Sequence, residues 1–211
     1  FNNIIAIISG LAELMLMKEN PDSYNYKRIP QILDTCKRGN EIVKNLMTFS
    51  TLRYENPQTL EVKSCVQEIV SLLRHMLPST VRLRYYIEAD LPDIFLSRSN
   101  LEQIIFNLSS NASDALPEQK GTIELTVSGQ QLDETKAQNL EPPASAGDYL
   151  CVEVIDTGNG ISPESQNKVL NPFFTTKKIG EGSGLGLSTI YGIVRNSRGG
   201  LDISSKVGIG T

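Results

Sequence analysis

Apolar residues recur at spacings of three and four along the first 50 residues, with polar residues between them. They form two stripes, one made of Ile4, Ile7, Ile8, Leu11, Leu14 and Met15 and the other of Ile29, Ile32, Leu33, Cys36, Val43, Leu46 and Met47. This periodicity predicts two amphipathic helices, the second with a spacing close to a heptad repeat. A polar, proline-containing turn at 20–23 separates them. The segment is therefore predicted to form a helical hairpin.

A single hairpin cannot cover both of its apolar stripes. The economical arrangement is a four-helix bundle to which two chains each contribute one hairpin. We therefore expect residues 1–54 to be a dimerisation domain that forms a homodimer. The alternative is a hairpin that packs on the C-terminal part of its own chain.

Beyond a predicted hinge at 53–59, the pattern alternates between strand and helix periods. Strands are predicted at 60–62, 81–87, 94–96, 122–128 and 149–155, and another from Leu201. Helices are predicted behind a cap at Ser64, behind a cap at Ser99 or Asn100, and over 188–195. Residues 130–147 are expected to form an exposed loop. Helices on one face of a mixed sheet indicate an α+β protein, with residues 55–211 forming a two-layer α/β sandwich.

Composition narrows the function classes. The formal net charge of -4 argues against a nucleic-acid binder, which normally carries a basic face. No apolar run is long enough to span a membrane, and no basic-then-apolar signal peptide is present, so we expect a cytoplasmic location without direct membrane insertion. The 3 cysteines are far apart and odd in number, which fits a reducing compartment and small buried side chains rather than a zinc or disulfide framework.

The stretch from Asp156 to Leu187 contains the clearest candidate chemistry. Asp156-Thr157-Gly158-Asn159-Gly160-Ile161 directly follows the apolar run 149–155, and Gly182-Ser183-Gly184-Leu185-Gly186-Leu187 precedes the predicted helix at 188–195. Glycines allow close approach of the backbone to a ligand, and a helix N-terminus presents N–H groups to phosphate. The polar, lysine-bearing segment between the two clusters suggests a movable cover over a nucleotide site.

Asn107 and Asn111 lie one helical turn apart, so their amides project from the same face of the predicted helix. Asparagine is a poor helix former, and an amide oxygen suits Mg²⁺, which prefers oxygen ligands and usually bridges nucleotide phosphates. The alternative is a pair of solvent-exposed asparagines.

Four motifs in order resemble those of sensor histidine kinases. They are Asn107-x-x-x-Asn111, Asp156-x-Gly158-x-Gly160, Phe173-Phe174-Thr175-Thr176-Lys177 and Gly182-x-Gly184-x-Gly186, which are similar to the asparagine, first glycine, phenylalanine and second glycine boxes. The segments Gly199-Gly200 and Gly208-Ile209-Gly210-Thr211 resemble the closing glycine segment of the family. The hairpin resembles its dimerisation and phosphoacceptor bundle, so the resemblance covers essentially the whole chain.

The resemblance implies a role for each matching residue. At the base, Asp156 would accept a hydrogen bond from the adenine amino group, and Thr211 would lie near adenine through a water. Elsewhere along the nucleotide, the implied contacts are Gly158, Gly160, Ile161, Phe173, Gly182, Ser183, Gly184, Leu185, Gly186 and Leu187. Asn111 would coordinate Mg²⁺ with Asn107 beside it, and Lys177 would reach the terminal phosphate of ATP from the lid. Phe173 and Phe174 would anchor that lid in an apolar pocket.

The same resemblance implies a phosphoacceptor histidine just before Phe1-Asn2-Asn3. Asn3 then falls where the family positions water for dephosphorylation of a receiver domain, although helix capping explains Asn2 and Asn3 equally well. His75 is the only histidine present, but its place in the first helix of the second domain favours a structural role. The glycine run at 182–186 lacks the Gly-Lys-Ser/Thr sequence of a P-loop. It also follows the predicted lid, whereas a dinucleotide-binding fingerprint follows a strand.

The main hypothesis is the catalytic core of a sensor histidine kinase. It would bind Mg-ATP, transfer the terminal phosphoryl to a bundle histidine and pass it to an aspartate of a response-regulator receiver domain. One alternative is an ATP-hydrolysing conformational clamp of the same superfamily. Another is a non-catalytic dimeric scaffold or phosphatase.

Overall fold

The computed structural model describes residues 2–50, 58–177 and 182–211. The chain divides into two compact units, one holding Phe1–Tyr54 with Lys177–Ser183 and the other Glu55–Thr176 with Gly184–Thr211. The predicted hinge falls largely at 53–57, outside the described residues. The predicted domain division at 54/55 therefore stays a prediction, and each unit is described by itself.

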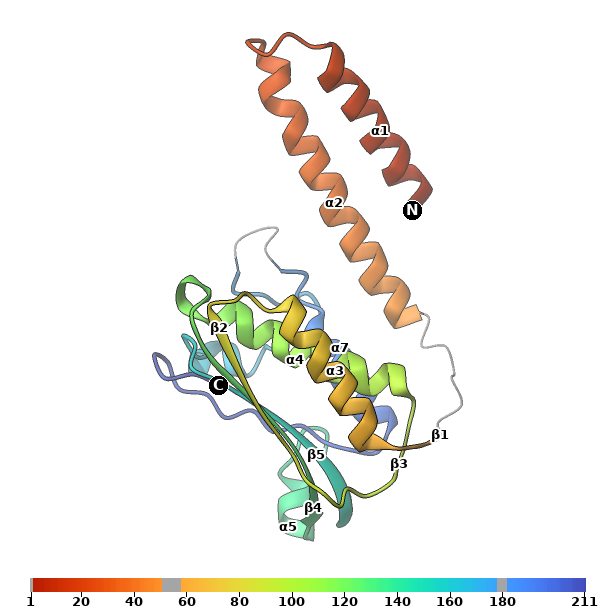
Figure 1. Cartoon of the computed structure of the whole chain (residues 1–211), viewed down its shortest axis with the longest axis vertical. Coiled ribbons are helices and arrows are strands. Elements are labelled where there is room, and N and C mark those ends of the chain that lie inside the picture. Colours follow the sequence, from red (N-terminus) through yellow and green to blue (C-terminus); the bar gives the residue numbers. More distant parts are fainter. Residues whose placement is uncertain (1, 51–57, 178–181) are drawn as a thin grey trace. The chain divides into compact units, whose positions relative to one another are not determined.

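The first unit contains two helices, α1 (Asn2–Lys18) and α2 (Tyr24–Ser50), which lie side by side (Figure 1). Ala12, Ile29 and Cys36 are buried in this unit. Gly39 allows close packing, since a Cβ there would lie 3.1 Å from Ile5 Cδ1. The predicted hairpin is confirmed.

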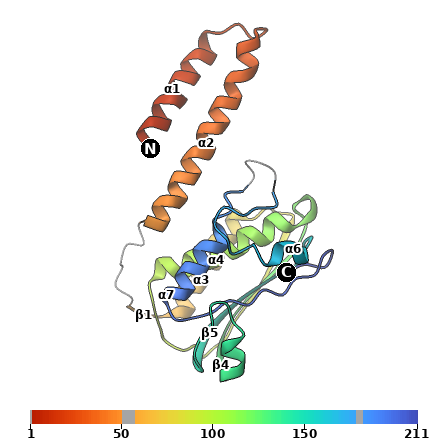
Figure 2. The same cartoon turned by 180° about the vertical axis from the view of Figure 1, so that it is seen from behind.

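The second unit is a sheet covered by helices on one face (Figures 1 and 2). Its strands are β2 (Val81–Ile87), β4 (Gly121–Leu132) and β5 (Gly147–Asp156), in the order β2-β4-β5. β2 pairs in parallel with β4, and β4 pairs antiparallel with β5. β1 (Gln58–Leu60) and β3 (Ile94–Leu96) form a separate antiparallel pair.

The covering helices are α3 (Val62–Met76), α4 (Arg98–Ala115) and α7 (Gly186–Asn196). The residues of β4 predicted to share one face, Ile123, Leu125 and Val127, are all fully buried. Leu125 and Val127 pack with α3 and α4, while the α7 residues Ile190 and Ile193 pack against Ile104 of α4. Helices on one face of a mixed sheet confirm the predicted two-layer α+β architecture.

Two predicted helix starts are wrong. Val62, expected in a strand, begins α3, and Glu61 rather than Ser64 occupies the cap position; the Ser64 hydroxyl instead donates to Glu61 O. For α4 the cap is Ser97, whose hydroxyl accepts from the Asn100 N–H at 3.2 Å. In both cases a hydroxyl-bearing residue inside the first turn was mistaken for the cap before it.

The predicted loop at 130–147 and the strand from Leu201 are also partly wrong. β4 continues to Leu132, and the short helix α5 (Glu134–Gln138) follows. Leu132, Ala137 and Ala144 form a small buried cluster, which gives this polar segment its own core. Beyond Leu201, the described residues form only isolated bridges, Glu141 with Leu201 and Lys206 with Gly210.

Candidate functional site: a glycine-lined end of the sheet

Asp156 closes β5, opposite Ile123 of β4. Its side chain is buried, with 7% exposed, and Oδ1 accepts the Gly158 N–H at 2.7 Å. Burial raises the pKa of this carboxyl above its ordinary value, while hydrogen bonds to the backbone at Gly158 and Thr211 act in the opposite direction. The strand end therefore presents a sheltered carboxylate that can accept a hydrogen bond.

The two glycines after Asp156 leave no room for side chains. A Cβ at Gly158 would lie 2.7 Å from Ala115 O at the end of α4. Gly160 has φ +68, and a Cβ there would overlap Lys206 O. Since glycine alone adopts this conformation without strain, the loop is pressed between α4 and the C-terminal segment.

The C-terminal segment closes over the same strand end. Asp156 N–H donates to Thr211 O at 2.9 Å, and Gly208 N–H donates to Asn159 O at 2.8 Å. Gly210 is required here, because a Cβ would overlap Asp156 O. Beside them lies a cavity of about 240 Å³, lined by Ile155, Asp156, Ser204, Ser205, Lys206, Ile209, Gly210 and Thr211.

Asn107 and Asn111 lie beside the start of α7. Asn107 Nδ2 donates to Gly186 O at 3.4 Å, and a Cβ at Gly186 would lie 3.5 Å from Asn111 Oδ1. Both amides are partly buried. They therefore lie beside the first turn of a helix, where backbone N–H groups are available to a ligand.

The phenylalanine box and the second glycine box are adjacent. Phe173 N–H donates to Gly184 O at 2.9 Å. Gly184 has φ +66, and a Cβ there would lie 2.5 Å from the Phe173 carbonyl carbon. Leu185 is buried, and Leu187 packs with the α4–α7 core, so both leucines contribute packing and only their backbone is suited to a ligand.

Phe173 departs from expectation. Its side chain is 61% exposed, so it does not occupy an apolar pocket in this structure. Its φ of 67 accompanies the hydrogen bond to Gly184, so backbone pairing holds the residue rather than burial of its ring. Lys177, Gly182 and Ser183 group with the other unit, and 178–181 lie outside the described residues. The roles of those three residues therefore stay predictions.

Asn3, His75 and the cysteines complete the set of candidate residues. Asn3 is an exposed residue in the first turn of α1. His75 is exposed near the end of α3, with Nδ1 2.8 Å from Ser71 O, as the structural interpretation expects. Cys36 and Cys65 are buried, but Cys151 is only partly so.

Ser205 and Gln166 belong to the site but were missed from the sequence. The Ser205 hydroxyl accepts the Ile161 N–H at 2.7 Å, and Gln166 Nε2 donates to Ile161 O at 3.0 Å. Serine and glutamine are common surface residues, and no spacing distinguished these two. Only the closing glycine segment after Ser205 gave a signal nearby.

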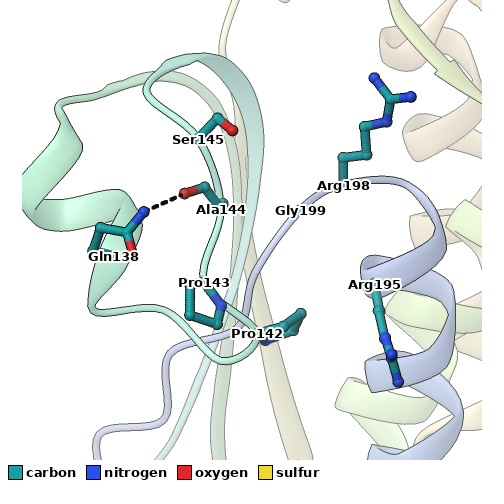
Figure 3. Close-up of a pocket in the computed structure, with 8 residues that line it drawn as sticks. All are labelled: Gln138, Pro142, Pro143, Ala144, Ser145, Arg195, Arg198 and Gly199. Atoms are coloured by element: carbon teal, nitrogen blue, oxygen red, sulfur yellow. Dashed lines mark hydrogen bonds between the residues drawn. The ribbon is translucent and has the colours of Figure 1, made fainter.

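A larger cavity of about 470 Å³ lies elsewhere, between the 138–145 segment and the end of α7 (Figure 3). None of the predicted site residues lines it. Its two cationic side chains, Arg195 and Arg198, extend in different directions and do not converge on a common point. We therefore place no ligand there.

The asparagine pair fits magnesium only together with a nucleotide. Among the described residues, no three His, Cys, Asp or Glu side chains gather in a metal-binding cluster. Asn111 and Asn107 offer one amide oxygen each, whereas Mg²⁺ takes six oxygen ligands and often draws several from phosphates and water. The adjacent turn of α7 is a suitable place for those phosphates.

No helix within the described ranges is long and apolar enough to cross a membrane. That finding concerns only these ranges.

The sequence comparisons agree on a family. Residues 97–211 match the family described as histidine kinase-, DNA gyrase B-, and HSP90-like ATPase. The chain is 32% identical over 212 residues to the sensor kinase CckA of Brucella abortus, covering 100% of this chain and 22% of that protein. It spans less than half the length of this and the next curated relatives.

Solved structures share the fold. Full-length ShkA, solved in complex with AMPPNP, superposes with a TM-score of 0.69 at 17% identity, covering 100% of this chain and 42% of that one. The histidine kinase ThkA, solved with the response regulator TrrA, gives 0.59 at 21% identity, covering 92% and 51%. The chain belongs to the histidine kinase-, DNA gyrase B- and HSP90-like ATPase family and, within it, to the sensor histidine kinases.

Proposed function

We propose that this chain binds Mg-ATP and transfers its terminal phosphoryl to a histidine of a helical bundle, from which an aspartate of a response regulator receives it. One observation carries the proposal. One face of α4 presents Asn107, Asn111 and Ala115 on successive turns. The two asparagines lie beside Gly186, and Ala115 O accepts the Asn159 N–H at 3.0 Å. One helix face thus connects the predicted phosphate end with the predicted base end.

At the base end, Asp156 accepts a hydrogen bond from the adenine amino group. The closely packed backbone at Gly158, Gly160 and Ile161 supports the ring, and Thr211 lies beside Asp156, whose N–H donates to Thr211 O. These roles are supported by the burial of Asp156 and by its contacts with Gly158 and Thr211.

At the phosphate end, the backbone from Gly182 to Leu187 wraps the phosphates. Asn111 holds Mg²⁺, with Asn107 beside it. Lys177 and Phe173 belong to the cover, and the lysine charge counters that of the transferring group. This chemistry is mainly positioning and charge neutralisation.

The hairpin supplies the bundle. The α1 residues Ile4, Ile7, Leu11 and Leu14 are each more than half exposed, which supports a homodimer through 1–54 because a second hairpin would cover them. We place the acceptor histidine upstream of Phe1, and Asn3 beside the phosphorylated group, where it positions water for dephosphorylation. The proposed location is the cytoplasm.

The molecules bound in two fold-neighbour structures are compatible with these partners. ShkA was solved with the ATP analogue AMPPNP, and ThkA was solved with a response regulator. A receiver domain is therefore the proposed protein partner, and nucleic acid is not expected at a net charge of -4.

The test uses γ-labelled ATP with this chain and with the same chain extended upstream through the acceptor histidine. Acid-labile, base-stable label on the extended form alone is the expected result. Steady phosphate release without protein label would instead establish an ATP-hydrolysing clamp, and absence of nucleotide binding would establish a scaffold or phosphatase.

Two variants refine this test. Asn111→Ala should weaken Mg²⁺-dependent nucleotide binding by at least tenfold, because an oxygen ligand is lost. Asn100→Ala removes the same side chain from the start of the same helix, away from Gly186, and should leave binding unchanged.

A further inference from the structure

The Ser205 hydroxyl has three hydrogen-bond partners at the predicted base end. It lies 2.7 Å from Ile161 N, 3.1 Å from Gly210 O and 2.9 Å from Thr211 Oγ1. A hydroxyl has one proton to donate and two lone pairs. Three partners therefore use its full capacity.

The chemistry of the partners determines the direction of each bond. Ile161 N–H can only donate, and Gly210 O can only accept. The single proton of Ser205 must therefore point to Gly210 O, so the bond with Thr211 must run from the Thr211 hydroxyl to Ser205 Oγ. The proton of Thr211 is thereby committed, and its oxygen has only lone pairs left for any other group.

Thr211 and Asp156 line the same cavity of about 240 Å³. An ionised carboxylate also accepts hydrogen bonds without donating any. With the Thr211 proton turned toward Ser205, both side chains present acceptors, either directly to a ligand or to a water that must donate to them.

We propose that Ser205 is a positioning residue that holds the Thr211 hydroxyl as an acceptor and so makes the site select a base bearing an amino group over one bearing a carbonyl oxygen. This inference rests on the proposed nucleotide function. It adds a specificity-determining residue that lies outside the nucleotide-contact set predicted from the sequence.

Gln166 provides a matched control. Its Nε2 donates to Ile161 O and to Ser205 O, at 3.0 and 3.1 Å. It therefore ties the same loop to the same C-terminal segment, but it does not contact the Thr211 hydroxyl. Loss of Gln166 should loosen the loop without releasing the Thr211 proton.

The experiment measures dissociation constants of Mg-ADP and Mg-IDP for the full chain by calorimetry at pH 8. IDP carries a carbonyl oxygen where ADP carries the amino group. Ser205→Ala frees the Thr211 proton to donate to that oxygen, so the preference for ADP over IDP should fall about fivefold, the value of one ordinary hydrogen bond. Ser205→Thr, which keeps the hydroxyl, should retain the preference.

The controls separate specificity from stability. Gln166→Ala should weaken the binding of both nucleotides by the same factor and leave the ratio of their dissociation constants unchanged. Thr211→Val removes the hydroxyl itself and should also lower the ratio, and adding Ser205→Ala to it should change the ratio no further. Thr211→Val alone still tests the proposal if Ser205→Ala does not fold.

Equal weakening of ADP and IDP by Ser205→Ala, or an unchanged ratio in Thr211→Val, would overturn the inference while leaving the nucleotide function intact. If the unmodified chain binds neither nucleotide, the proposed function itself fails, and this inference fails with it.

Discussion

Helices α1 and α3 carry similar apolar stripes in the sequence, but the stripe of α3 is buried in the structure and that of α1 is exposed. In α3, Val66 and Ile69 are fully buried. In α1, Ile7 is 62% exposed and Leu11 is 58% exposed. Periodicity thus predicts an apolar face, but it does not say what covers that face.

The difference follows from the partners within the chain. The stripe of α3 packs on α4 and on Leu125 and Val127 of the sheet, so its own unit covers it. Helix α1 packs against α2, and the buried residues of this unit include Ala12 and Cys36. The larger residues of α1 face outward and are available to a second hairpin.

Among variants that test this difference between the two helices, Ile69→Ala in α3 should have the largest effect. Truncating a fully buried isoleucine loses its burial and leaves a cavity, so the unfolding free energy of the second unit should fall by about 3 kcal/mol. Denaturant unfolding, followed by circular dichroism, measures it. Leu72→Ala in the same helix truncates a side chain that is 52% exposed and should cost less than about 1 kcal/mol. Equal losses would show that α3 is not packed as described.

The next effect is expected from Leu11→Glu in α1. A charge on the outward stripe should weaken the proposed homodimer at least tenfold, which corresponds to about 1.4 kcal/mol, because burying an unpaired carboxylate is unfavourable. Sedimentation velocity over a range of concentrations reads this out.

Glu13→Gln serves as the control, because it changes an exposed polar position of the same helix without touching the stripe. The unfolding transition of the second unit should be the same in both variants. An unmodified chain that is monomeric at every concentration would remove the dimer from the proposal.

The same contrast explains how much the sequence could predict. Positions with strong periodicity, such as Ile123, Leu125 and Val127, gave strands and buried faces correctly. The cap of α4 was predicted wrongly because Ser97 and Ser99 are chemically equivalent candidates, and only backbone conformation decides between a cap and a first-turn residue. The cap of α3 was predicted wrongly because Glu61 is not a residue type that usually caps a helix. The core of 132–144 was missed because it rests on small alanines within a polar segment.

The sequence indicated candidate site residues where a residue type has few other uses. Paired helix-interior asparagines and glycines at fixed spacing restrict the alternatives, and the structure brings Asn107, Asn111 and Gly186 together. Ser205 has no such signature, because its importance comes from three partners that only the fold assembles. The exposure of Phe173 was equally unpredictable, since an aromatic side chain in sequence indicates burial.

A smaller effect on stability is expected from Ser109, which lies on the buried face of α4. Ser109 is fully buried, and its hydroxyl has no hydrogen-bond partner among the described residues. An unsatisfied buried hydroxyl costs free energy, so Ser109→Ala should raise the unfolding free energy by about 1 kcal/mol. Ser97→Ala, which removes the cap of the same helix, should lower it by about 1 kcal/mol. A loss in Ser109→Ala would indicate a partner for this hydroxyl, such as a buried water.

The smallest effect should come from Asp156→Asn and should depend on pH. Because burial raises the pKa of Asp156 above its ordinary value of 3.8, the folded state binds more protons than the unfolded state between these two pKa values. Stability from this group is therefore fully present below pH 3.8 and is lost as pH rises through the raised pKa.

Asparagine cannot ionise, and its amide oxygen can still accept the Gly158 N–H. The unfolding free energy of Asp156→Asn relative to the unmodified chain should therefore increase with pH across that window and become constant above it. Urea unfolding at closely spaced pH values measures this difference, and Asp114→Asn at an exposed position of α4 is the control. A difference that decreases with pH would mean that hydrogen bonding outweighs burial, so that the strand end is built to hold a charged carboxylate even without a ligand.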